Sequence, residues 1–98
     1  VAIEADGLSS SSPRNIDVIG SSPITCRGRV VHASVTYYSA KSGAGVFVAG
    51  TIHWTCALMA VRCSNLSNIP VVRKATENIL RAFAEGPAGL KHPSAGRR

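Results

Sequence analysis

The stretch from Ser34 to Met59 constrains the fold most, because it holds every Tyr and Trp of the chain and its densest β-branched runs. Val-Thr-Tyr-Tyr at 35–38 and Val-Phe-Val at 46–48 have the composition of strands. Lys-Ser-Gly-Ala-Gly at 41–45 separates them, and its two glycines tolerate the positive φ of a tight turn. We predict a β-hairpin over residues 34–51.

The predicted hairpin leads into a corner and then a helix. Its second strand ends at Gly50 and Thr51, and the apolar segment 52–61 is predicted to be helical. A strand that enters a helix through such a corner is typical of α/β domains, in which these corners often border a site. Thr51, His53 and Trp54 are therefore the candidate site residues. The alternative is structural: Trp54 anchors the core and His53 is a hydrogen-bonded polar neighbour.

The clearest helix is predicted over residues 70–85. Pro70 suits a first helical turn, and Gly86 with Pro87 ends the helix. Glu77 lies four residues from both Arg73 and Arg81, so it can pair in either direction. Four residues at helical spacing form one apolar stripe that is expected to pack on the hairpin: Val72, Ala75, Ile79 and Phe83.

The segments on either side of this unit have a different composition. Residues 1–15 contain a run of four serines and are expected to be flexible, and residues 87–98 are expected to form a basic tail. Residues 16–20 fit a short buried strand, which Ser-Ser-Pro at 21–23 would end, with a loop at 26–29. The predicted partial α/β domain therefore spans residues 16–86.

Four motifs carry a resemblance to a known family. They are Thr-Tyr-Tyr at 36–38, Ser-Gly-Ala-Gly-Val-Phe at 42–47, Ala-Gly-Thr-x-x-Trp at 49–54 and Thr-Glu-Asn-Ile-Leu-Arg-Ala-Phe at 76–83. From about Asp17 to His92 the chain resembles the C-terminal end of N,N-dimethylformamidase large (beta) subunit-like proteins. The resemblance implies an incomplete part of a glutamine-amidotransferase-like α/β domain. The fold class expected is α/β, as an α+β fragment in which a β-hairpin and a short strand are covered by the C-terminal helix.

The resemblance also implies a function. The family hydrolyses the C–N bonds of small amides and uses an iron centre with tyrosine and glutamate ligands. Neither Tyr37 nor Tyr38 can be aligned with those ligands, and no segment matches the nucleophile elbow of such folds. Related sequences have Met-Arg where this chain has Ile52 and His53, which removes a fixed cation. We therefore expect a chain without the catalytic centre, without a cofactor and inactive on its own.

The cysteines and histidines suggest two further sites, and we favour neither. His53 and Cys56 are three residues apart on the predicted helix, as a Cys–His nucleophile pair would require, but Cys56 fits better as a small buried hydrophobic residue. Cys26 and His32 would add zinc ligands, yet the paired spacing of zinc sites is missing, so no metal site is expected. The adjacent tyrosines are expected to face opposite sides of the hairpin, one buried and one exposed.

Composition bounds the location and the partners. Ninety-eight residues make one small domain with a thin core. Three cysteines without a signal peptide favour reduced thiols and a cytoplasmic protein. The uncharged window 42–61 is long enough to span a bilayer, but its glycines, threonines and histidine argue against a membrane segment. Of the net charge of +6, residues 51–98 carry +5, on one helix face and the tail rather than beside aromatic residues.

Three functions remain open from the sequence. The first is the inactive terminal part of a dimethylformamidase-like protein, which would need a missing upstream domain or self-association to complete its sheet. The second is a small interaction module that dimerises through hairpin edges. The third is a basic nucleic-acid-binding protein, which the lack of a recognised motif disfavours.

Overall fold

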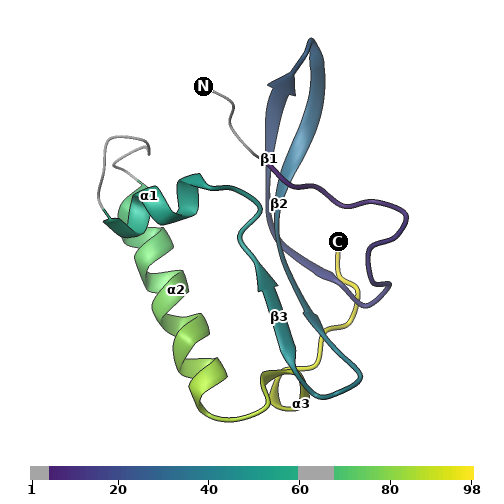
Figure 1. The fold of residues 1–98 in the computed structure, drawn as a ribbon, viewed down its shortest axis with the longest axis vertical. Helices are drawn as coiled ribbons and strands as arrows, with labels where there is room; N and C mark the ends of the chain where they lie inside the picture. The colour runs from purple at the N-terminus through teal and green to yellow at the C-terminus, as the bar shows by residue number, and fades with distance from the viewer. Residues whose placement is uncertain (1–4, 60–67) are drawn as a thin grey trace.

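The computed structural model describes residues 5–59 and 68–98 (Figure 1). Three strands form one antiparallel sheet in the order β1-β2-β3, and three helices follow it along the chain. The small α+β domain expected from the sequence is therefore confirmed. The elements are β1 (Asp17–Cys26), β2 (Arg29–Ser39), β3 (Gly45–Val48), α1 (His53–Met59), α2 (Ile69–Ala84) and α3 (Ala88–Lys91).

The predicted hairpin is the β2–β3 pair. Its register runs from Thr36 opposite Val48 to Ser39 opposite Gly45. The turn between the strands is closed by the Ala40 N–H, which donates to the Ala44 carbonyl at 2.8 Å. Gly43 has a φ of 89°, in the region that favours glycine, so this turn confirms the glycine-based prediction.

The first strand is longer than the sequence suggested. We predicted a strand at 16–20 and a turn at 21–23, but β1 continues through Pro23, which lies opposite His32. This is allowed because β1 is an edge strand, where a residue without an N–H loses no ladder bond. The chain instead turns at Arg27 and Gly28, whose φ values of 49° and 75° suit a two-residue hairpin loop.

The sheet is covered on both faces (Figure 1). On one face Tyr37 contacts Phe83 of α2, with ring centroids 6.5 Å apart. On the other face Tyr38 lines a pocket with Pro13 and Ile16 of the N-terminal segment. The two tyrosines do point to opposite sides, but both are half-buried, so the prediction of one buried and one exposed ring was wrong.

The helices lie close to their predicted positions. Residues 53–59 of the predicted segment 52–61 form α1, while 60 and 61 lie outside the described residues. Helix α2 matches the prediction to within one residue at each end. Glu77 pairs with Arg81 at 3.0 Å and with Lys74 at 3.6 Å, whereas Arg73 donates to the Leu58 carbonyl at 3.2 Å. The pairing of Glu77 with Arg81 is confirmed, and that with Arg73 is not formed.

The C-terminal segment lies along the sheet, although we expected a tail there. After α3 it runs back beside β1, where the Val18 N–H donates to the Arg97 carbonyl at 2.8 Å. The Gly96 N–H donates to the Asn15 carbonyl at 3.2 Å. Figure 1 shows the two terminal segments on the side of the sheet away from α1 and α2.

The core is thin. In the described part of the chain, the buried apolar residues are Ile16, Ala57 and Ala88, and no large side chain is completely enclosed. The molecule exposes 7029 Å², whereas a compact monomer of 10.2 kDa exposes about 5,300 Å². Much apolar surface therefore lacks cover within this chain. Among the described residues, no helix has the length and hydropathy needed to cross a membrane.

Candidate functional site

The predicted corner is built on Gly50. Its φ is 74°, and a Cβ at this position would collide with the Ser34 carbonyl, so glycine is required. The Thr51 hydroxyl then accepts a hydrogen bond from the His53 N–H at 3.2 Å, at the point where α1 begins. Gly50 thus directs the chain from β3 into α1 and fixes the positions of the side chains that follow.

Trp54 joins the sheet to α2. Its indole N–H donates to the Thr76 hydroxyl at 2.9 Å, and that hydroxyl donates to the Val72 carbonyl at 2.8 Å. Its ring lies 5.6 Å from the ring of Phe47, at an interplanar angle of 59°. Through these contacts Trp54 connects α1 to the sheet and to α2, which is the structural role of the alternative interpretation. Its side chain is only half-buried.

The structure brings the three candidate residues together. Thr51, His53 and Trp54 line one cavity of ≈ 380 Å³, which Val35, Val71 and neighbouring residues complete. His53 is half-buried, and within the described residues its imidazole has no hydrogen-bond partner. The hydrogen bond that the structural alternative gave to His53 is therefore not made by a protein group in this part of the chain. Its imidazole is available to a ligand in this cavity.

The cysteines differ from the prediction. Cys56 is half-buried and disulfide-bonded, so it is neither a reduced thiol nor a nucleophile for His53. Cys26 is a free, exposed cysteine near the β1–β2 turn. Cys63 lies outside the described residues. Among residues 5–59 and 68–98, no three His, Cys, Asp or Glu side chains gather as a metal site would require.

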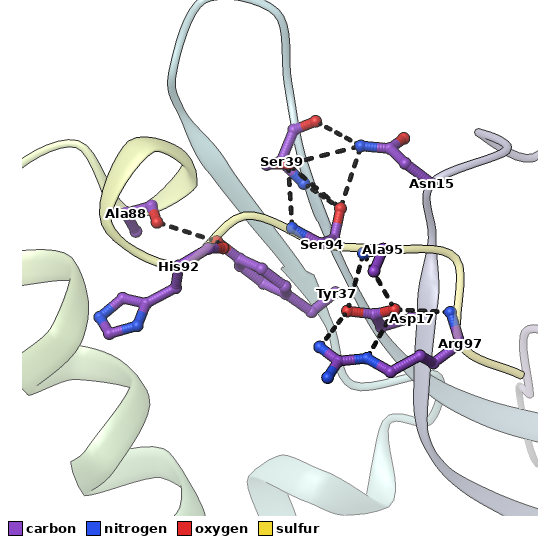
Figure 2. A network of polar contacts seen from close by, with 9 residues as sticks. All are labelled: Asn15, Asp17, Tyr37, Ser39, Ala88, His92, Ser94, Ala95 and Arg97. Carbon is purple, nitrogen blue, oxygen red and sulfur yellow. Dashed lines mark hydrogen bonds and ion pairs between the residues drawn. The ribbon is translucent and has the colours of Figure 1, made fainter.

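A second polar cluster, the C-terminal clasp, was not found from the sequence (Figure 2). Its centre is Asp17, which is buried at the start of β1. The carboxylate accepts hydrogen bonds from the N–H groups of Ala95 and Arg97, at 3.3 and 2.7 Å, and forms a 3.0 Å ion pair with the Arg97 guanidinium. The Arg97 hydrogen bonds hold the pKa of Asp17 at about 2, below its ordinary value of 3.8.

Two neighbouring groups extend the clasp. The Asn15 amide donates to the Ser39 carbonyl at 2.8 Å and to the Ser94 hydroxyl at 3.0 Å. The Tyr37 hydroxyl lies 3.1 Å from the Ala88 carbonyl and 2.8 Å from the His92 carbonyl, so it shares one proton between them. Burial raises the pKa of Tyr37 above 10.0. The polar groups of the clasp bond to one another, which indicates a structural role.

Residues 1–68, which include the whole sheet and α1, match the family model described as N,N-dimethylformamidase beta subunit-like, C-terminal. The chain belongs to this N,N-dimethylformamidase beta subunit-like C-terminal family. The resemblance read from the motifs is thereby confirmed, although the motif at 76–83 lies beyond the matched residues. Searches of curated proteins and of solved structures gave no match. Membership in the family assigns no activity to this chain.

The iron centre that the dimethylformamidase resemblance implies does not fit the described residues. A tyrosine binds iron as phenolate, but the Tyr37 hydroxyl donates to backbone carbonyls and its raised pKa opposes ionisation. Tyr38 lies on the opposite face of the sheet. Glu77 is paired with cations on α2, and Glu85 is exposed at the end of that helix. The described tyrosines and glutamates therefore do not form an iron site.

Proposed function

We propose that this chain is a non-catalytic C-terminal part of a dimethylformamidase-like amide hydrolase, inactive by itself. The state of Asp17 carries the proposal. Among the carboxylates that the structure describes, Asp17 alone is buried, and its lone pairs are taken up by Arg97 and Ala95. With a pKa of about 2, it is too weak a base to activate water near neutral pH.

Amide hydrolysis needs an activated nucleophile and a group that stabilises the developing oxyanion. His53 is the remaining candidate base, but the nearby Cys56 is disulfide-bonded, and the described residues that line the His53 cavity include no carboxylate. An unsupported imidazole lacks the third group that orients the base in such sites. The cavity fits a binding or packing role better than a hydrolytic one.

The apolar face between α2 and the sheet supports a larger assembly. Ile19, Phe47, Ile79 and Phe83 line a hollow of ≈ 230 Å³ there, and Ile19 remains 62 % exposed. A small monomer gains nothing from leaving such residues in water. We propose that an upstream domain covers this hollow, and that small amides are substrates of the complete assembly only.

The cytoplasmic location remains a prediction. It rested in part on reduced thiols, and the disulfide at Cys56 removes that part of the argument.

An assay of residues 1–98 with N,N-dimethylformamide, with and without added iron, tests the proposal. We expect no turnover. Turnover that disappears in His53→Ala but persists in the matched control His32→Ala would overturn it and identify the corner as a catalytic site. His32 is a suitable control because it is exposed on the β1–β2 hairpin and does not line the His53 cavity.

Complementation gives a positive test of the same proposal. A dimethylformamidase beta subunit shortened by its C-terminal segment should be inactive, and residues 1–98 supplied in trans should restore hydrolysis. Ile19→Asp should abolish the rescue, because Ile19 is 62 % exposed and the change places a charge in the hollow that the upstream domain is proposed to cover. Rescue that is equally efficient with Ile19→Asp would contradict the docking surface.

A further inference from the structure

The outer part of the β1–β2 hairpin, residues 21–32 and here called the arm, has no core of its own. Figure 1 shows it projecting beyond α1 and the body of the sheet. Every residue in the arm is exposed except Ile24, which is half-buried, and Val30 near the tip is 67 % exposed. A two-stranded ribbon without a covered face is only marginally stable in water. A partner that covers one face of the arm would stabilise it.

The strand register shows which side chains share one face of the arm. Val30 lies opposite Thr25, His32 opposite Pro23, and Ser34 opposite Ser21. Because side chains alternate along a strand, these pairs share one face. At the base of the arm, a groove of ≈ 720 Å³ is lined by Ser21, His32 and Ser34 of that face, and by Leu8 and Val18. The exposed tip valine and an apolar-lined groove thus lie on the same face.

Charge distinguishes the two ends of this face. The sequence has no acidic residue between Asp17 and Glu77, and Arg27 at the tip has no ion pair among the described residues. Asp6, in the segment beside the groove, is exposed and likewise unpaired in that part of the chain. The base carries both signs, because Arg98 lines the groove beside Asp6. When two arms lie antiparallel, Arg27 at one tip can still pair with Asp6 at the other copy's base, and this arrangement also keeps the two basic tips apart.

The surface area is sufficient for a dimer. The molecule exposes 7029 Å², about 1,700 Å² more than a compact monomer of its mass, and a standard interface buries about 800 Å² from each partner. Six residues of strand make the arm about 20 Å long, enough for a tip to reach the other copy's base. Because such a dimer has two-fold symmetry, the contact between tip and base is formed twice.

We propose that two copies of this chain associate through their arms, with Val30 of each seated in the base groove of the other and Arg27 directed toward Asp6. The contact is isologous and closes at two copies. It uses the face of the arm opposite to the helices, so it does not depend on the function proposed above. An assay for amide hydrolysis does not bear on it.

Sedimentation equilibrium of residues 1–98 tests the proposal. The wild-type chain should have the mass of a dimer at micromolar concentration, and Val30→Asp should weaken association by about tenfold or more. Leu80→Asp is the control, because Leu80 is 64 % exposed on α2 and lines neither the base groove nor the His53 cavity. A monomeric wild-type chain, or equal effects from both variants, would overturn the proposal.

Charge exchange tests the register. Arg27→Glu and Asp6→Lys should each weaken the homodimer, and an equimolar mixture of the two variants should recover association. Arg98 also lines the groove and opposes an incoming cation, so Arg98→Glu should tighten the dimer. Failure of the mixture to recover would refute the pairing of tip and base. A monomeric chain whose arm variants lose affinity for duplex DNA would refute the dimer in favour of a nucleic-acid partner.

Discussion

The C-terminal clasp and the Thr51–Trp54 corner hold the same sheet by different means. The clasp is polar and joins residues about eighty positions apart, with Arg97 and Ala95 bonded to Asp17. The corner is held by ring packing between Trp54 and Phe47 and by one side-chain hydrogen bond to α2. The clasp leaves little bonding capacity for a ligand, whereas the corner leaves the imidazole of His53 beside a cavity.

This comparison distinguishes polar groups whose hydrogen bonds hold the fold together from polar groups that are free to bind a ligand. A carboxylate that accepts several hydrogen bonds and an ion pair is held in its charged form and is a poor acid or base. Asp17 is such a group, although it is the most strongly perturbed carboxylate that the structure describes. A perturbed pKa by itself would have selected the clasp as the functional site. The hydrogen bonds show that the corner is the better candidate for binding.

The largest effect is expected at the corner, from Gly50→Ala. The added Cβ would collide with the Ser34 carbonyl and the positive φ would be strained, so the free energy of unfolding should fall by about 3 kcal/mol. Gly28→Ala is the control, because Gly28 has nearly the same φ, 75°, but no atom near a new Cβ. It should cost about 1 kcal/mol. Equal losses in urea denaturation would show that backbone strain alone decides both.

The clasp should appear in the pH dependence of stability. The pKa of Asp17 is about 2 in the folded state and has its ordinary value of 3.8 in the unfolded chain, so its contribution to stability is complete above pH 3.8 and is lost as the pH falls through 2. Thermal unfolding followed between pH 5 and pH 2 should show this loss in the wild type. Asp17→Asn should be less stable at pH 5 and should have a flatter acid limb. A wild-type limb as flat as the variant's would contradict the structural role of the clasp.

The sequence predicted the apolar parts of this fold better than the polar parts. The hairpin at 34–51 and the helix at 70–85 follow from β-branched runs, a glycine turn and a 3.6-residue stripe, all of which are local signals. The clasp has no local signal, because Asn15, Ser39 and Ser94 are residue types that loops also favour. The only indication was Asp17 beside apolar Ile16 at a strand start, and it did not reveal Arg97, eighty residues away.

The contrast between local signals and long-range contacts also explains why the candidate site was predicted only in part. Thr51, His53 and Trp54 are close in sequence, so the strand-to-helix corner predicted their proximity, and they do line one cavity. Their more distant neighbours in the cavity come from β1, β2 and α2, which local patterns do not place. The turn predicted at 21–23 failed because Pro23 can also lie on an edge strand, and edge position depends on the whole sheet.

A smaller effect is expected from the link between the corner and α2. Trp54→Phe keeps a ring against Phe47 but removes the indole N–H that donates to Thr76, so it should cost about 1–2 kcal/mol. Thr76→Val removes the acceptor. In a double-mutant cycle the two changes should be coupled by about 1 kcal/mol. Additive losses would show that the hydrogen bond contributes nothing and that packing alone fastens the corner.

The smallest effect is expected from Arg73, one of two arginines that reach across the fold. Arg73 donates to the Leu58 carbonyl at 3.2 Å from an exposed position and forms no ion pair in the described structure, so Arg73→Ala should cost under about 0.5 kcal/mol. Arg97→Ala should destabilise the protein more, because Asp17 loses its guanidinium partner and keeps only backbone donors. The excess should disappear in the Asp17→Asn background, where there is no charge to neutralise. Equal losses from the two arginines in chemical denaturation would place the clasp among ordinary surface ion pairs, which contribute little.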